Sequence, residues 1–164
     1  ALECFDVAPD GGTLAATDWS PPSGGSTLAL FDLAGGEPRA LGEGLCPAFA
    51  PAGDRLAFLG YGEETRGLWV LDLATGARRR VAEDRGAIGL PESNAARRPA
   101  WSPDGSRVAM SFHSGDSVIV DGVTGAMIRR ITNVIRMCAS RVHVDQMINT
   151  GFFNYVSKNC IGCW

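Results

Sequence analysis

Apolar residues occur along the chain in short unbroken runs, such as "LWVL" at Leu68–Leu71 and "VIV" at Val118–Val120. A strand with one face in water alternates apolar and polar positions, whereas a strand packed on both faces need not alternate. The runs are strand-sized, and none approaches the roughly 18 apolar residues of a membrane-spanning helix. The pattern therefore predicts β-strands that are covered on both faces, and no transmembrane segment.

Turns of one kind recur at three places, which align on Pro9, Pro51 and Pro103. They read "DVAPDGG", "AFAPAGD" and "AWSPDGS", and the segments that follow them read "TLAAT", "RLAFLG" and "RVAMSF". Proline presets φ for a turn, aspartate bonds its own backbone, and glycine accepts the left-handed conformation. Each copy is therefore predicted to begin with a strand, a tight turn and a second strand.

A second turn and a more polar strand complete each copy. The third strand runs into a turn that suits a hairpin, within the segments Thr27–Gly36, Leu68–Gly76 and Ser117–Gly125. The outer segments "EPRAL", "ARRRVA" and "AMIRRIT" carry charge, as expected of a strand that faces water. Four strands per copy are therefore predicted, with the last strand outermost.

The spacing of the copies indicates the fold. The aligned prolines at positions 9, 51 and 103 lie 42 and 52 residues apart. The first interval matches a four-stranded propeller blade, which spans roughly 40–45 residues, and the second holds an extra loop at Gly86–Ala96. We predict an all-β fold, a partial β-propeller of about three four-stranded antiparallel blades in residues 1–132. The blades are expected at about residues 3–44, 45–85 and 97–132.

The third copy, "PAWSPDGSRVAMSF" followed by "VIVDGVTGAMIRRIT", resembles the PD40 or TolB-like propeller repeat, a WD40-like family. That pattern reads roughly P-x-W/F-S-P-D-G-x-x-I/L/V-A/V-F, and the matching positions are Pro99, Trp101, Ser102, Pro103, Asp104, Gly105, Val108 and Ala109. The second copy has Ala52-Gly53 in place of Asp-Gly, and the first has Asp6-Val7 where the aromatic residue is expected. The resemblance covers about residues 3–132. It implies a propeller and a periplasmic or cell-envelope location, and such blades also occur beside peptidase domains.

An array of three blades does not close a ring, because propellers typically have 4–8 blades. An open stack leaves blade faces in water and strand edges unpaired, which is an aggregation hazard. The sequence therefore predicts that something covers them: the C-terminal tail, a second copy, another chain, or further blades.

Composition narrows the class of partner. Charged residues are 20% and hydrophobic residues 45% of the chain, as in globular proteins, and the net charge is −3. The basic clusters, "ARRR" at Ala77–Arg80 and "ARR" at Ala96–Arg98, are interpreted as solvated strand ends. A nucleic-acid-binding protein usually carries a basic face, so no nucleic-acid partner is predicted.

The composition changes after Thr132. Residues 133–164 hold the only lysine, Lys158, and three of the five cysteines, and no fourth copy of the repeat appears there. The segment "SRVHVDQMI" alternates and "NTG" is turn-like, so a hairpin is one interpretation. Docking onto a blade edge or onto another subunit is a second. Its candidate interface residues are aromatic: Phe152, Phe153, Tyr155 and Trp164.

Sequence motifs for catalysis or metal binding are weak. "HSGDS" at His113–Ser117 lacks the glycines that follow a protease serine and is interpreted as a polar loop. "CIGC" at Cys160–Cys163 leaves three alternatives open: free thiols, a disulfide, or a zinc site shared with Cys138 and His143. The disulfide is the candidate we carry forward, with no catalytic residue, metal or cofactor predicted.

These observations favour a non-catalytic protein–protein interaction or scaffold module, an accessory subunit of a larger, membrane-associated assembly. Its expected partners are other protein subunits, with self-association through open blade edges. The first alternative is the propeller fragment of a larger hydrolase or peptidase. The second is a small ligand- or metal-binding module that uses the cysteines of the tail.

Overall fold

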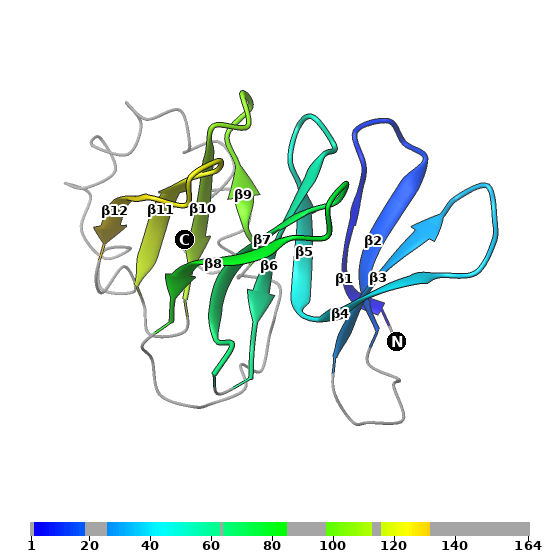
Figure 1. Cartoon of the computed structure of the whole chain (residues 1–164), viewed down its shortest axis with the longest axis horizontal. Coiled ribbons are helices and arrows are strands. Elements are labelled where there is room, and N and C mark those ends of the chain that lie inside the picture. Colours follow the sequence, from blue (N-terminus) through cyan, green and yellow to red (C-terminus); the bar gives the residue numbers. More distant parts are fainter. Residues whose placement is uncertain (1, 19–25, 63, 85–97, 113–115, 132–164) are drawn as a thin grey trace, which may run out of the picture.

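A computed structural model describes residues 2–18, 26–62, 64–84, 98–112 and 116–131. In this part of the chain all regular structure is β, arranged as three four-stranded antiparallel sheets, each built from strands consecutive in sequence. The sheets stand side by side along the molecule (Figure 1). The predicted all-β, three-bladed partial propeller is therefore confirmed as a fold.

The three sheets are named blades 1 to 3, and in each the strands run in sequence order from the inside outwards. Blade 1 comprises β1 (Leu2–Val7), β2 (Thr13–Asp18), β3 (Thr27–Asp32) and β4 (Arg39–Glu43). Blade 2 comprises β5 (Leu45–Phe49), β6 (Arg55–Gly60), β7 (Gly67–Asp72) and β8 (Arg78–Glu83). Blade 3 comprises β9 (Ala100–Trp101), β10 (Arg107–Ser111), β11 (Ser117–Asp121) and β12 (Met127–Ile131).

The turn between the first two strands of each blade uses the chemistry that its sequence suggests. Gly53 and Gly105 have φ of 74° and 68°, in the left-handed region that glycine adopts without strain. In blade 3 the Asp104 carboxylate accepts hydrogen bonds from the Ser102 hydroxyl at 2.6 Å and from the Ser106 N–H at 3.0 Å. These bonds lower the pKa of Asp104 to about 2.

In blades 2 and 3 the hairpin between the third and fourth strands is a repeated Asp-x-x-Thr-Gly turn. Asp72 accepts from the Thr75 N–H and hydroxyl, both at 2.7 Å. Asp121 accepts from the Thr124 N–H at 2.6 Å and from its hydroxyl at 2.9 Å. These hydrogen bonds lower the pKa of both carboxyl groups. The ionised carboxylate of each aspartate is therefore the form that stabilises the turn.

The core lies between the blades. One cluster joins blades 1 and 2 through these buried residues: Ala8, Ala15, Leu28, Phe49, Leu56, Phe58 and Leu71. A second joins blades 2 and 3 through these: Ala57, Leu68, Val70, Val81, Ala82, Val108, Met110, Phe112, Val118 and Val120. Blade 2 is covered on both faces, which explains the unbroken apolar run in β7. Each fully buried Leu or Val contributes roughly 1.5–3 kcal/mol.

Within the described residues, no helix is long and apolar enough to cross a membrane.

Candidate interaction surface

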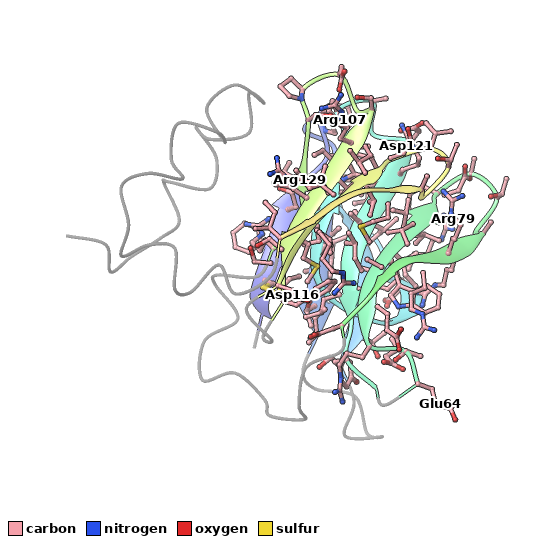
Figure 2. All side chains as sticks on the ribbon, turned by 90° about the vertical axis from the view of Figure 1, so that its left-hand side faces the viewer. Glu64, Arg79, Arg107, Asp116, Asp121 and Arg129 are labelled. Atoms are coloured by element: carbon pink, nitrogen blue, oxygen red, sulfur yellow. A yellow bond between two sulfur atoms is a disulfide. The ribbon has the colours of Figure 1, made fainter. Side chains whose placement is uncertain are left out.

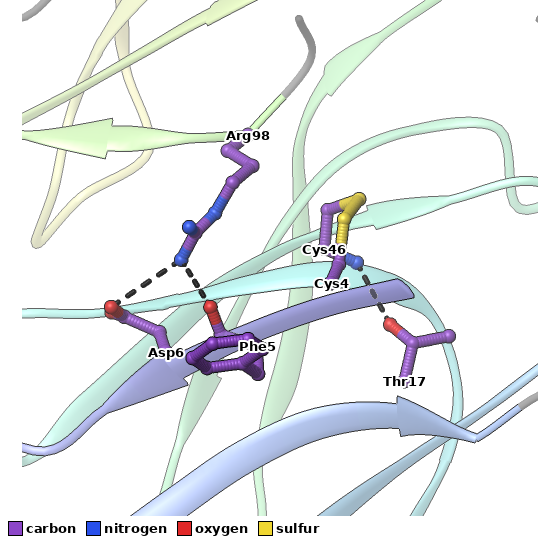
Figure 3. The surroundings of a disulfide bond; sticks show 6 residues. All are labelled: Cys4, Phe5, Asp6, Thr17, Cys46 and Arg98. Atoms are coloured by element: carbon purple, nitrogen blue, oxygen red, sulfur yellow. Dashed lines mark hydrogen bonds and ion pairs between the residues drawn. A yellow bond between two sulfur atoms is a disulfide. The ribbon is translucent and has the colours of Figure 1, made fainter. Parts of the chain in front are cut away.

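The inner strands of blades 1 and 2 are joined by a disulfide between Cys4 and Cys46, shown in Figure 3. The two cysteines are 42 residues apart, so they occupy the same position in consecutive copies of the repeat. Both are buried, and the Cys46 N–H donates to the Thr17 hydroxyl at 3.0 Å. The disulfide fixes the two blades to each other at their innermost strands.

Asp6 links the inner ends of all three blades. Its Oδ2 accepts from the Phe49 N–H of β5 at 2.8 Å, and its Oδ1 lies 3.3 Å from Arg98, which directly precedes blade 3. Arg98 also donates to the Phe5 carbonyl at 2.5 Å (Figure 3). The carboxylate of Asp6 in blade 1 therefore contacts blade 2 and the segment that leads into blade 3.

Arginines of blade 2 bind backbone carbonyls of both neighbouring blades. Arg55 donates to the Gly122 carbonyl at 2.7 Å and lies 5.1 Å from the Trp101 ring centroid. Arg79 donates to the Thr124 carbonyl at 2.5 Å and also to the Val123 carbonyl.

On the other side of blade 2, Arg78 donates to the Glu43 carbonyl of blade 1 at 3.1 Å, and also to the Leu41 carbonyl. The interpretation of the basic clusters as merely solvated strand ends is therefore wrong for Arg78, Arg79 and Arg98. These arginines lie at or just before the starts of strands, and their guanidinium groups reach backbone carbonyls of neighbouring blades.

Blade 1 exposes an apolar face on the side away from blade 2. The register pairs Val7 with Leu14 and Leu14 with Phe31, which places these side chains on one face across three strands. Phe5 lies on the same face and is 53% exposed, and Val7 is 44% exposed. This surface is called the N-face. Its exposed or partly exposed residues are Phe5, Val7, Leu14 and Phe31, whereas Ala16 and Ala29 on the same face are buried.

Blade 3 has its own outward face, seen from the front in Figure 2. Cross-strand pairs Ala100–Ala109, Ala109–Ile119 and Ile119–Arg129 run across it. Arg107 lies on the same side of β10, and both Arg107 and Arg129 are exposed. This surface is called the C-face, and its residues are Ala100, Arg107, Ala109, Ser111, Ser117, Ile119 and Arg129.

A third exposed apolar group lies on the β11–β12 hairpin. Val123 is 65%, Met127 45% and Ile128 49% exposed. The alignment of the repeats places Ala74 of blade 2 opposite Val123, and Arg78 opposite Met127. This hairpin patch, Val123, Met127 and Ile128, is therefore a feature of blade 3 that blade 2 does not share.

The sequence-based candidates fall in different places. The four interface aromatics, Phe152, Phe153, Tyr155 and Trp164, lie outside the described residues, as do Cys138, His143, Cys160 and Cys163. Ser117 of the "HSGDS" segment belongs to strand β11 rather than to a loop, and its hydroxyl lies 2.7 Å from that of Ser111 across the sheet. That contact joins two strands of the C-face.

Within the described residues, no group of three or more His, Cys, Asp or Glu side chains is placed to hold a metal ion. A small cavity of about 170 Å³ lies where the turns of blades 1 and 2 meet, with Asp10 and Thr13 among its polar lining. Small-molecule sites usually have about 300–1,000 Å³. The exposed faces and the hairpin patch are therefore the stronger candidates for recognition.

Sequence reasoning missed the Cys4–Cys46 disulfide and the Asp6–Arg98 contact. A signal for the disulfide was present, because the cysteines are separated by the interval between Pro9 and Pro51. Equivalent positions on the inner strands of adjacent blades lie next to each other. For Asp6 no comparable signal exists, since its partners come from non-equivalent positions.

Comparison with known proteins finds a related sequence. No protein-family model matches the sequence. Over 113 residues the chain is 33% identical to the Tol-Pal system protein TolB of Gluconobacter oxydans (strain 621H). This match covers 65% of the chain but 23% of that protein, so the chain spans less than a quarter of the length of this relative.

Solved structures show the same fold. The chain superimposes on TolB from Acinetobacter baumannii with a TM-score of 0.61 at 20% identity, over 79% of this chain and 32% of that one. For the β-propeller domain of the Trilobed protease from Pyrococcus furiosus the TM-score is 0.60 at 17% identity, over 79% and 41%. The chain therefore has a β-propeller fold, and its sequence is distantly related to that of TolB.

Proposed function

We propose that the chain is a non-catalytic protein–protein interaction module that acts as an accessory subunit of a cell-envelope assembly. The observation that carries this proposal is the hairpin patch, in which Val123, Met127 and Ile128 are all about half exposed or more. Apolar groups held in water on a rigid scaffold mark interaction sites. Hydrogen bonds hold the hairpin in place, since Asp121 and Thr124 close its turn and Arg79 binds its carbonyls.

Two further observations support the cell envelope as the location. Disulfides persist in oxidising compartments such as the bacterial periplasm and are rare in the cytosol, and Cys4–Cys46 is buried between two blades. The related protein of Gluconobacter oxydans is named as part of the Tol-Pal system.

Site-specific photocrosslinking in the source cells tests the proposal. A photoreactive residue is placed at Ile128, in the hairpin patch, and as a matched control at Glu37, which is exposed on the corresponding hairpin of blade 1. We expect a discrete adduct with a different protein from position 128 and none from position 37. No adduct at 128, or the same pattern from both positions, would reject the hairpin patch as a binding site.

The propeller part of a larger hydrolase is the second candidate function. The similarity in fold to the propeller domain of the Trilobed protease favours it. Labelling of the full natural gene product with a fluorophosphonate probe separates the two candidates. Labelling of a serine outside the blades would support the hydrolase, whereas an unlabelled product that still forms the Ile128 adduct supports the interaction module.

A further inference from the structure

We propose that the cavity where the turns of blades 1 and 2 meet binds an arginine side chain of a partner protein. The β1–β2 and β5–β6 turns stand side by side at one end of the molecule (Figure 1). The cavity of about 170 Å³ is smaller than the usual site of a whole small molecule, so it suits a single side-chain group. Both of its walls belong to described blades, and none of its residues belongs to the hairpin patch.

The corresponding space between blades 2 and 3 is filled by Arg55 of blade 2. Its guanidinium lies 5.1 Å from the centroid of the Trp101 ring and donates to the Gly122 carbonyl at 2.7 Å. The same side chain passes beside the first turn of blade 3, since a Cβ added at Gly105 would lie 3.7 Å from Nη2 of Arg55. The chain therefore contains its own example of a guanidinium held between two blades.

The first turns of neighbouring blades meet in the same way at both junctions. A Cβ added at Gly53 would lie 3.5 Å from Cδ of Pro9 in the preceding blade. A Cβ added at Gly105 would lie 3.5 Å from Cδ of Pro51 in its preceding blade. At these turns blade 2 is therefore set against blade 1 as blade 3 is set against blade 2.

The backbone acceptor of the guanidinium also has a counterpart. The Leu73 N–H donates to the Asp54 carbonyl at 3.0 Å, and the Gly122 N–H donates to the Ser106 carbonyl at 2.7 Å. These two bonds join equivalent positions of the repeat. Blade 2 therefore holds the Leu73 carbonyl where blade 3 holds the Gly122 carbonyl, the acceptor of Arg55.

The two junctions differ in the residue that fills the space. When the copies are aligned on Pro9 and Pro51, Thr13 stands in blade 1 where Arg55 stands in blade 2. The threonine side chain is too short to cross to the next blade. A cavity therefore remains in front of Thr13, which forms part of its wall.

Blade 2 supplies the groups that would receive a guanidinium there. Phe49 stands where blade 3 has Trp101, and it lines the cavity together with Leu73. Within the described residues, no cation lies over the Phe49 ring and no hydrogen bond is donated to the Leu73 carbonyl. The aromatic ring and the carbonyl of the Arg55 site are therefore both repeated here without the arginine.

Asp10 adds a negative charge at the rim of the cavity. Its Oδ1 accepts the Gly12 N–H at 2.9 Å, and its carboxylate is exposed. At the other junction a carboxylate also accompanies the guanidinium, because Asp54 Oδ2 lies 3.4 Å from Nε of Arg55. A carboxylate and an aromatic face attract a cation, and a carbonyl accepts its N–H.

Of the protein side chains, arginine meets all three demands. Its guanidinium is planar and always charged, and it carries several N–H donors, whereas the lysine ammonium is a compact, strongly hydrated charge. The cavity is open to a partner, since Pro9, Asp10 and Ala52 at its rim are exposed. The net charge of −3 favours the approach of a basic protein.

An NMR titration of the ¹⁵N-labelled full chain with the peptide acetyl-Gly-Arg-Gly-amide tests the proposal. We expect saturable shifts of the Thr13, Gly53 and Leu73 amides. The same peptide with citrulline or lysine in place of arginine should bind at least about tenfold more weakly, because citrulline lacks the charge and lysine the planar fork. Equal binding of the three peptides, or no binding of any, would overturn the proposal.

Variants of the cavity wall give a second readout. Thr13→Arg introduces the residue that the repeat has at positions 55 and 107, and it should fill the cavity and abolish peptide binding without changing the circular dichroism. Asp10→Asn should weaken binding about two- to fivefold. Glu37→Gln removes an exposed carboxylate outside the cavity and is the matched control. Binding that persists in Thr13→Arg, or equal losses in Asp10→Asn and Glu37→Gln, would contradict the proposal.

Arginines of the chain itself are excluded as the occupant by a further variant. If the arginine peptide shifts the cavity amides only after Arg136→Gln/Arg141→Gln, the chain's own residues fill the cavity, and a partner protein is the wrong occupant.

Photocrosslinking in the source cells identifies the natural occupant. With a photoreactive residue at Ala52, we expect an adduct with a different protein whose crosslinked peptide contains arginine, and we expect Thr13→Arg to lose it. An adduct confined to residues 132–164, no adduct, or one that persists in Thr13→Arg would overturn the proposal. An Ile128 adduct without arginine binding would remove this site and leave the proposed function standing.

Discussion

Cys4 and Cys46 stand at the same position in two consecutive copies of the repeat, and their disulfide joins the innermost strands of blades 1 and 2. Beside this bond, Asp6 binds the Phe49 N–H and the Arg98 guanidinium. The inner ends of the three blades are therefore held by one covalent bond and one shared carboxylate.

Removal of the disulfide should lower the free energy of unfolding. The bond closes a loop of 42 residues, for which the chain-entropy estimate is about 4 kcal/mol. We expect Cys4→Ser/Cys46→Ser to lose about 2–4 kcal/mol in urea unfolding. A reducing agent should destabilise the wild-type chain and leave the double variant unchanged, and equal sensitivity of both would contradict this role.

Asp6 should stabilise the fold more by accepting the Phe49 N–H than by its charge. Asp6→Ala leaves the Phe49 N–H without its acceptor and should cost about 1–3 kcal/mol. Asp6→Asn keeps an acceptor oxygen and loses only an ion pair whose side chains are 35% and 32% exposed, so it should cost about 0–1 kcal/mol.

Asp10→Ala is the control for Asp6, because Asp10 accepts a single exposed N–H, that of Gly12. Chemical denaturation of the three variants checks the order. An equal loss from Asp6→Asn and Asp6→Ala would show that the charge, and not the acceptor, matters.

Burial predicts a large difference between two leucines of blade 1. Leu28 is fully buried in the cluster between blades 1 and 2, whereas Leu33 is 56% exposed on the hairpin. Leu28→Ala should cost about 2–5 kcal/mol and Leu33→Ala less than about 0.5 kcal/mol in the free energy of unfolding. Similar losses from the two substitutions would argue against the packing of blade 1 on blade 2.

Asp104 should give the third blade a pH dependence at low pH. Its pKa is lowered from 3.8 to about 2, chiefly by the Ser102 hydroxyl and then by Ser106. The pKa is lower in the folded chain, so this stabilisation is complete above about pH 4 and is lost as the pH falls towards 2.

An NMR titration of the Asp104 carboxyl tests that assignment. Ser102→Ala should move its pKa up towards the ordinary value, because it removes the largest cause of the shift. Ser111→Ala is the control, since the Ser111 hydroxyl contacts Ser117 and no carboxylate. An unchanged pKa in Ser102→Ala would refute the hydrogen-bond explanation.

The fold could be predicted because its signals are local and repeated. Three turns aligned on Pro9, Pro51 and Pro103 define the strands, and unbroken apolar runs such as Leu68–Leu71 indicate strands covered on both faces. The polar outer strands were predicted for the same reason.

The contacts between blades could not be predicted in the same way, because they depend on which rim groups meet in space. Arg78 and Arg79 look like solvated residues in the sequence, yet the blade geometry brings them to carbonyls of blades 1 and 3. Asp6 replaces an apolar residue of the repeat, and only the structure shows its two partners. The candidate residues of the tail remain predictions, because they lie outside the described residues.

Native mass spectrometry of the chain isolated from its source cells shows whether this propeller is an interaction module. We expect a complex in which the chain and a different protein occur in fixed stoichiometry, and we expect Ile128→Glu to lose that protein. The Glu37→Ala variant should retain it. A chain recovered without any other protein, or with the same proteins bound to wild type and Ile128→Glu, would rule out the hairpin patch as the binding site of an interaction module.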